Sequence, residues 1–260
     1  MSDSKKTPIY VQLAETIKGR ILRDEYRPGE LLAPARDIER EFGVSAITVR
    51  KAMQILSHKG FIQSKQGVGT RIAKHSNEML DLELSGNFWD WADSALTRHL
   101  ETKTEVLDVE TLVCPGRIAE LMRLPTDSPI WRMKRIRKID GRPASYIVNY
   151  ALPSLVNGID RTLLSSLPFL TVYRDYCKVR ISSVEQRVRA VVADIDISRK
   201  LDIDFGDPVF FVENVYLNEI NVPVEVSCLY FRGDRYAYKT KNYFMETPDE
   251  DAKSKKDNNP

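Results

Sequence analysis

The segment GVSAITVRKAMQILSHKGFIQSKQGVGTRI, residues 43–72, constrains the fold more than any other part of the chain. Its first half places apolar residues at positions i, i+3, i+4 and i+7, which predicts a helix with one buried face. Those residues are Val49, Ala52, Met53 and Leu56. Ser45 stands where this helix needs an N-cap, and Gly60 is suited to end it. The opposite face is polar and carries Arg50, Lys51, Gln54 and His58.

Two helices are predicted before this one. Apolar residues recur every fourth position at Leu13, Ile17 and Ile21, and the pattern stops at RPGE. A second helix should follow Pro34 and end at Gly43. We expect its inward residues to be Ala35, Ile38 and Phe42. Only FGVS separates it from the third helix, and two helices joined by such a tight turn form a helix-turn-helix whose second helix enters a DNA major groove.

A short hairpin is predicted after the third helix. Residues 61–64 and 70–72 favour strands around the turn KQGVG. Gly67 and Gly69 permit a tight turn and a close approach of the backbone to a ligand. Lys65 and Gln66 lie at the tip. A basic hairpin beside a recognition helix indicates a wing that contacts DNA phosphates or the minor groove.

The charge distribution supports a polyanionic partner for the first part of the chain. Residues 1–74 contain 14 Lys and Arg against 8 Asp and Glu, a net charge of +6, and the remainder has a net charge of −4. A length of 260 residues predicts two compact domains. We therefore expect only the first domain to bind a nucleic acid.

The second part of the chain is predicted to be an α+β domain with an antiparallel sheet. Long strand patterns cover residues 105–114, 129–152, 179–193 and 208–231, with a hairpin turn at Asp140-Gly141. Short helices are expected at residues 118–124, 170–176 and 197–203. RLPTDSPIWRMKRIRKIDGRPASYIV resembles DIDFGDPVFFVENVYLNEINVPVEVS, with prolines offset by 79 and 80 residues. This spacing favours a duplicated half, although generic hairpins could match by chance.

The predicted domains are residues 1–74, a polar linker at 75–87, a second domain at 88–246 and a disordered tail at 247–260. Within the second domain, Phe88, Trp91, Ala92, Ala95 and Leu96 form one amphipathic helix face. The tail METPDEDAKSKKDNNP, from Met245 onward, has almost no apolar residues, which is typical of disorder.

The composition argues against a disulfide-rich, metal-binding, membrane-spanning or secreted protein. The three cysteines are far apart and odd in number, and the three histidines form no ligand pair, so we expect neither disulfides nor a metal or other cofactor. No apolar run of about 18 residues is present. MSDSKKTPIY lacks the apolar stretch of a signal peptide. These features predict a cytoplasmic protein.

Residues 8–72 resemble the winged helix-turn-helix domain of GntR-family bacterial transcription regulators. The elements PIYVQL, PGELL, TVRKA, GFI and GVGT carry this resemblance. The polar face and the resemblance together predict the DNA-binding residues, which are Arg36, Ser45, Thr48, Arg50, Lys51, Lys65, Gln66, Gly67 and Gly69. Two departures predict a different or looser operator: APAR keeps Arg36 but loses the usual Glu, and Ala46 replaces an arginine that commonly reaches DNA in relatives.

The second domain resembles the UTRA effector-binding domain of the HutC subgroup, whose fold is like chorismate lyase. The strand RIR and the motif YFRGDRYAY carry this resemblance over about residues 85–244. It implies a small-molecule pocket lined by Asn87, Arg135, Arg137, Thr171, Tyr173, Glu225, Tyr230 and Tyr236. Ile147 stands where many relatives have Glu, and Phe231 where a Tyr is usual.

Spacing gives independent support to an anionic ligand. Arg135 and Arg137 are two residues apart on a predicted strand and therefore share one face. Paired guanidinium groups suit a carboxylate, sulfonate or phosphate. The alternative is a solvated or salt-bridged sheet face.

The predicted function is a ligand-responsive transcription regulator, with repression the expected mode. It should bind a palindromic double-stranded DNA operator as a homodimer and respond to a small anionic effector. Two alternatives stay open: an enzyme with a chorismate-lyase-like fold, and an architectural protein that binds DNA without sequence preference. No acid–base pair or nucleophile constellation supports the enzyme.

Overall fold

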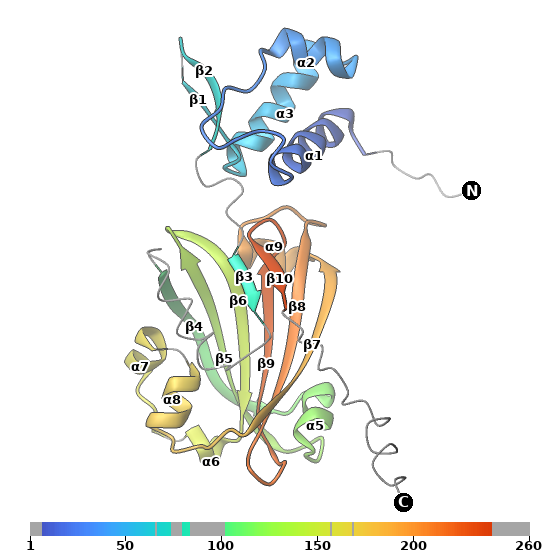
Figure 1. Cartoon of the computed structure of the whole chain (residues 1–260). Helices are drawn as coiled ribbons and strands as arrows, with labels where there is room; N and C mark the ends of the chain where they lie inside the picture. Colours follow the sequence, from blue (N-terminus) through green and yellow to red (C-terminus); the bar gives the residue numbers. More distant parts are fainter. Residues whose placement is uncertain are drawn as a thin grey trace, which may run out of the picture.

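The computed structural model describes residues 7–65, 67–73, 80–83, 102–156, 158–167 and 169–240. It contains a small N-terminal domain of helices with a hairpin, and a larger domain built on an antiparallel sheet (Figure 1). The small domain lies against one end of the sheet, on the side where α9 (Ile195–Leu201) is found. No helix among the described residues is long and apolar enough to cross a membrane.

The N-terminal domain has the predicted order of elements. The helices are α1 (Ile9–Leu22), α2 (Ala35–Phe42) and α3 (Ala46–His58), and the hairpin consists of β1 (Ile62–Lys65) and β2 (Gly69–Ile72). Gly43 ends α2 with φ +61°, a backbone conformation that glycine adopts without strain. The Ser45 side chain accepts a hydrogen bond from the Thr48 amide, so the predicted N-cap of α3 is confirmed.

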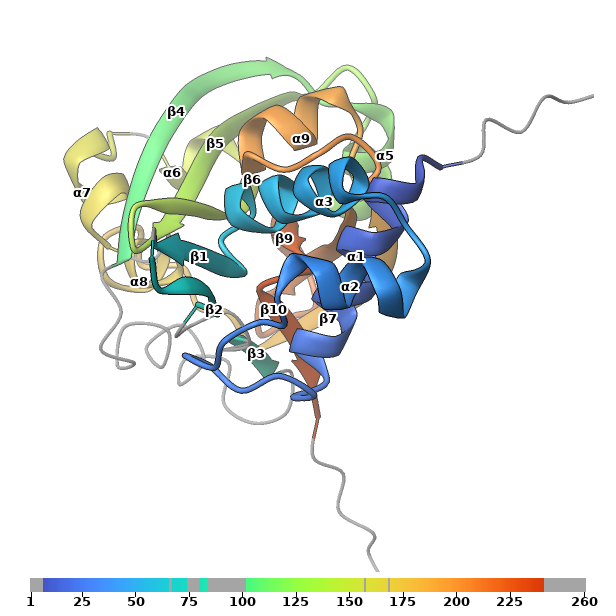
Figure 2. The ribbon, with the colours of Figure 1, turned by 90° about the horizontal axis from the view of Figure 1, so that it is seen from above.

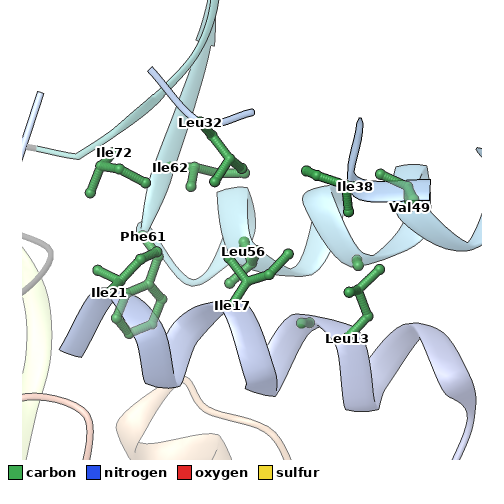
Figure 3. Close-up of a cluster of buried hydrophobic side chains, with 12 residues drawn as sticks. Leu13, Ile17, Ile21, Leu32, Ile38, Val49, Leu56, Phe61, Ile62 and Ile72 are labelled. Carbon is green, nitrogen blue, oxygen red and sulfur yellow. The ribbon is translucent and has the colours of Figure 1, made fainter. Parts of the chain in front are cut away.

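The core of this domain joins all of its elements (Figure 3). Ile17 and Ile21 of α1 pack with Leu56 of α3, and Ile62 and Ile72 bring the hairpin onto the same cluster. The buried face predicted for α3 is confirmed, because Val49, Ala52 and Leu56 are fully buried and Met53 packs at the edge.

The prediction that Ala35 of α2 faces inward is wrong. Ala35 is the first residue of the helix and is exposed, whereas Ile38 is buried and Phe42 half-buried. The helical spacing places Ala35 on the same stripe as the other two. However, α2 is only two turns long, and its first turn extends beyond the edge of the core.

The second domain is one six-stranded antiparallel sheet with strand order β4-β5-β6-β9-β8-β7. The strands are β4 (Thr102–Val113), β5 (Pro129–Ile139), β6 (Arg142–Ala151), β7 (Ser183–Val192), β8 (Pro208–Leu217) and β9 (Pro223–Arg232). Helices α5 (Gly116–Met122) and α9 cover one face, while α6 (Pro153–Val156), α7 (Arg161–Ser166) and α8 (Phe169–Asp175) lie towards the other.

The duplication predicted from the sequence is present in the topology. The first half runs β4-α5-β5-β6 and the second runs β7-α9-β8-β9, and β6 pairs with β9 at the centre. Asp140 and Gly141 both have positive φ and form the predicted β5–β6 turn. Helices α6 and α7 were missed, because four and six residues are too few for a helical period to emerge.

Part of the predicted linker belongs to the second domain. Strand β3 (Leu80–Glu83) pairs in parallel with β10 (Tyr236–Lys239), so the chain leaving the first domain is attached to the end of the second. A four-residue strand gives almost no alternation from which to predict it. The amphipathic helix predicted at residues 88–96 and the predicted tail at 247–260 lie outside the described residues.

Candidate DNA-binding surface and effector cavity

The polar face of α3 is exposed, as its pattern predicts. Arg50, Lys51, Gln54 and His58 are all exposed. Lys51 lies over the ring of Tyr10, with Nζ 5.2 Å from the ring centroid, so part of its charge is used within the domain. Arg50 has no hydrogen bond or ion pair within the described residues. It is therefore a charged side chain of α3 that is available for a base edge or a phosphate.

The wing and the start of α2 supply further predicted DNA contacts. Lys65 is exposed at the end of β1, and Gly67 and Gly69 have φ of +77° and +101°. Arg36 is exposed in the first turn of α2. Gln66 lies outside the described residues. In Figure 2, α2, α3 and the hairpin lie in front of the second domain, which leaves this side of the small domain accessible.

Two exposed apolar residues on this surface were missed by the sequence analysis. Ile47, in the first turn of α3, is 65% exposed, and Val68, at the wing tip, is 44% exposed. An apolar side chain at the start of a recognition helix can contact the methyl group of thymine. In the sequence, Ile47 lies off the buried stripe of α3 and Val68 lies in a turn, and neither position separates them from ordinary surface residues.

A cavity of about 310 Å³ lies on the face of the sheet next to α7 and α8. This is within the size range of small-molecule sites. Strands β4, β5, β6, β8 and β9 form its floor, because alternate residues of each strand point to the same face. The lining residues are Thr102, Lys103, Thr104, Arg135, Arg137, Ile147, Asn149, Ser165, Ser166, Leu167, Phe169, Leu170, Tyr216, Glu225, Ser227 and Leu229.

Three buried polar side chains form a chain across this floor. Arg135 Nη2 donates a hydrogen bond to Asn149 Oδ1 at 3.1 Å, and Asn149 Nδ2 donates to Glu225 Oε1 at 2.6 Å. Arg135 also lies over the ring of Phe169, 5.5 Å from its centroid. Arg135 Nε and Glu225 Oε2 are buried without a hydrogen-bond partner within the described residues. Both atoms could bind a ligand.

The electrostatics of the cavity follow from this burial. Burial raises the pKa of Glu225 from 4.5 to about 7, against the opposing effects of the Asn149 hydrogen bond and the Arg135 charge. Burial also lowers the pKa of Arg135 to about 10, and the charge of Arg137 acts in the same direction. Arg135 therefore remains charged at neutral pH, while Glu225 is about half protonated. The cavity is left with excess positive charge.

The structure places only part of the predicted effector set around the cavity. Arg135, Arg137 and Glu225 line it, so the expectation that the two arginines share a face is confirmed. Asn87 lies outside the described residues. Thr171 is on α8 but is not among the lining residues.

The structure corrects the role predicted for three tyrosines of this set. Tyr173 is fully buried, and its hydroxyl donates to the Val224 carbonyl oxygen at 3.0 Å, so it holds α8 on the sheet. Tyr230 follows Leu229 on β9 and therefore points to the opposite face, where it stacks on Tyr146. Tyr236 is buried edge-on against Phe231 and is not among the residues that line the cavity. The resemblance suggested that these aromatic residues contact the ligand. Each of them packs in the core instead, as most buried aromatic residues do.

The sequence analysis missed Asn149, Tyr216 and Ser227. Each is a polar residue within a mainly apolar strand, and each is buried. A buried polar residue in such a strand is unusual and needs a partner, which is a usable sequence signal. What the sequence could not supply is the pairing of β6 with β9, which brings Asn149 opposite Ser227 and next to Glu225.

Comparisons with known proteins match both domains. Residues 9–72 match the family model described as bacterial regulatory proteins, gntR family, and residues 97–237, more than half of the chain, match the UTRA domain. The regulator GgaR of Escherichia coli K12 is 26% identical over 232 residues, covering 89% of this chain and 90% of its own. The mannosyl-D-glycerate transport/metabolism system repressor MngR of the same organism is 25% identical, covering 91% and 93%.

Solved structures show the same fold. The crystal structure of PhnF from Mycobacterium smegmatis has a TM-score of 0.59 at 18% identity and covers 90% of this chain and 100% of its own. The relatives are DNA-binding regulators, which excludes the enzyme alternative, and a UTRA domain of this size goes beyond what an architectural DNA-binding protein requires. The chain belongs to the gntR family of bacterial regulatory proteins, as a ligand-responsive transcription regulator with a UTRA effector domain.

Proposed function

We propose that the protein is a repressor that binds a palindromic operator as a homodimer, and that a small anionic metabolite releases or repositions it. Arg50, Thr48 and Ile47 on α3, with Lys65 on the wing, are the proposed groups that contact DNA. A two-fold dimer presents two such helices to two half-sites, which is why the operator should be palindromic. Because the operator is chromosomal DNA, the proposed location is the cytoplasm.

The cavity carries the proposal about the effector. Two guanidinium groups, Arg135 and Arg137, line it together with one carboxyl group, Glu225, which is only partly ionised at neutral pH. An anionic group would balance the excess positive charge and provide acceptors for Arg135 Nε. Glu225 Oε2, which has no hydrogen-bond partner within the described residues, is the proposed acceptor for a hydroxyl or amine of the same ligand. A carboxylate, sulfonate or phosphate carried by a polyhydroxylated molecule meets both requirements.

The relative MngR supplies a first test compound. Its name refers to the transport and metabolism of mannosyl-D-glycerate, in which a sugar is joined to a carboxylic acid. Such a compound combines hydroxyl donors with one anionic group. Its two parts, mannose and glycerate, are matched controls, since mannose has no anionic group and glycerate has no sugar.

The experiment measures release of the full chain from DNA. An operator is first selected from a random pool of duplexes, and fluorescence anisotropy then follows its binding. Mannosyl-D-glycerate and a series of sugar phosphates and sugar acids are added one at a time, each with its neutral parent sugar. The proposal predicts that anionic members release the protein and neutral parents do not. Release by neutral sugars at equal concentrations would contradict an anionic effector.

A cavity variant connects this release to the proposed site. Arg137→Met should weaken effector-driven release at least 10-fold, since loss of about 1.4 kcal/mol corresponds to a factor of ten. Binding to the operator without effector should remain close to normal, because Arg137 lies in the second domain. Arg199→Met, on the exposed side of α9, is the matched control. Sedimentation velocity of the full chain tests the dimer, and a monomer at tens of micromolar would overturn it.

A further inference from the structure

Lys59, the residue that caps the C-terminal end of α3, connects the two domains. Its Nζ lies 3.1 Å from Asp207 Oδ1 and 3.2 Å from Asp207 Oδ2, and 3.2 Å from Asp204 Oδ2. Both aspartates belong to the turn between α9 and β8, residues 202–207, which we name the acidic turn. Figure 2 shows α3 beside α9, in agreement with these contacts.

The acidic turn has internal hydrogen bonds that fix its shape. The Asp204 amide donates to Asp207 Oδ2 at 3.1 Å. The Ala193 amide donates to the Asp207 carbonyl oxygen at 2.9 Å, and the Gly206 amide donates to the Ala193 carbonyl oxygen at 2.8 Å. The Asp207 carboxylate is therefore held in place by its own domain, and Lys59 inserts into this preformed acceptor.

Lys59 is more buried than a typical surface lysine. Its side chain is only 10% exposed, and Glu15 of α1 lies 3.4 Å away on its other side. Burial opposes its positive charge, but hydrogen bonds and charge attraction from Asp207, with help from Glu15, outweigh that effect and raise its pKa. A lysine that is enclosed by three carboxylates has a defined position, unlike most surface ion pairs.

In a second contact, the residue after the β5–β6 turn lies against the chain just beyond the same end of α3. Gly60, next to Lys59, has φ +80°, and a Cβ atom there would overlap the guanidinium group of Arg142. Arg142 begins β6, only five residues beyond the cavity residue Arg137 on the same hairpin. The hairpin that lines the effector cavity therefore reaches the residue that follows the C-cap of the recognition helix.

We propose that the acidic turn is a docking surface for the C-terminal end of α3, and that the Lys59 ion pairs with Asp204 and Asp207 fix the orientation of the DNA-binding domain on the effector domain. The inference rests on the proposed function, in which α3 is the recognition helix. The docked contact sets where each recognition helix of a dimer points. Movement of the β5–β6 hairpin or of the acidic turn then changes that direction.

The test measures how freely the two domains move in the full chain, without DNA or effector. Spin labels are placed on cysteines introduced at Arg40 of α2 and Arg180 before β7, both highly exposed, after the native cysteines have been replaced. Labelled protein is diluted into excess unlabelled protein, so that electron–electron distances are measured within one chain. The wild-type background should give one narrow distance distribution at low salt.

Lys59→Met should broaden this distribution at least two-fold, and Asp204→Asn with Asp207→Asn should do the same. Lys200→Met, an exposed lysine on α9, is the matched control and should leave the distribution narrow. A distribution that is already broad in the background, or equally narrow in Lys59→Met, overturns the proposal. Because no ligand or DNA is needed, either outcome is separate from failure of the proposed function.

Discussion

Arg135 and Glu225 face the same cavity as buried opposite charges, but the Asn149 side chain joins them instead of a direct ion pair. Asn149 accepts a hydrogen bond from Arg135 at 3.1 Å and donates one to Glu225 at 2.6 Å. One further polar atom of each charged group is left buried without a partner within the described residues. Polar atoms that are buried without a partner cost free energy, and a ligand that satisfies both atoms recovers it.

The first prediction concerns the pH dependence of stability. Glu225 has a folded-state pKa of about 7, compared with 4.5 when exposed, so the folded state holds the proton more tightly than the unfolded state. Its ionisation therefore lowers the free energy of unfolding as pH rises from about 4.5 to about 7, by about 3 kcal/mol in total. Glu225→Gln removes this dependence, because the amide cannot ionise but keeps the acceptor for Asn149.

Urea denaturation of both proteins at pH 5 and pH 7.5 checks this prediction. The free energy of unfolding of the wild type, taken relative to that of Glu225→Gln, should be lower at pH 7.5 than at pH 5. If the difference in free energy of unfolding between the two proteins is the same at both pH values, Glu225 is not a buried carboxyl group with a raised pKa.

The second prediction concerns Asn149 itself. Asn149→Leu keeps the approximate volume but removes both hydrogen bonds to charged partners, leaving Arg135 and Glu225 buried without mediation. The free energy of unfolding should fall by about 3–5 kcal/mol. Ser227→Ala is the control, since Ser227 is a buried polar residue on the same floor whose hydrogen bonds join it only to neutral side chains, Asn214 at 3.4 Å and Tyr216, within the described residues. It should lose about 1 kcal/mol or less. Equal losses in the two variants would show that Asn149 has no special role.

The third prediction concerns DNA affinity. Arg50→Ala should weaken binding to the selected operator by about 1–3 kcal/mol and reduce preference at one base position. Arg36→Ala should weaken binding to operator and scrambled duplexes alike, and should lower the salt slope by about one unit if Arg36 binds a phosphate. Titrations at several salt concentrations measure both effects, with Lys200→Ala as the control for loss of one positive charge. Normal operator binding by the combined Arg50→Ala, Lys51→Ala variant would contradict the assignment of the α3 surface.

The fourth prediction concerns Ile47. If its exposed side chain contacts a thymine methyl group, Ile47→Ala should weaken operator binding, and replacing that thymine with uracil should weaken binding of the wild type to a similar degree. The two changes together should cost little more than either alone, because they remove the same contact. Fully additive losses would place Ile47 away from the base.

The sequence alone determined the first domain almost completely, because its helices depend on local signals. The stripe of apolar residues, the Ser45 cap and the Gly43 stop act within a few residues of each other, and each was found where predicted. The turn at Asp140-Gly141 and the repeated strand pattern were local in the same sense. The placement of Arg135 and Arg137 on one face followed from the two-residue period of a strand.

Only the tertiary structure decided which residues meet across the second domain. Asn149 and Glu225 are 76 residues apart, and Lys59 and Asp207 are 148 apart, so no local pattern brings them together. Tyr173 and Tyr230 were misassigned for the same reason: side-chain direction depends on how α8 packs and on which sheet face the cavity occupies. Pairing of β6 with β9 and docking of α3 on the acidic turn are long-range events. Their outcome is set by burial of the whole core, which composition and spacing do not specify.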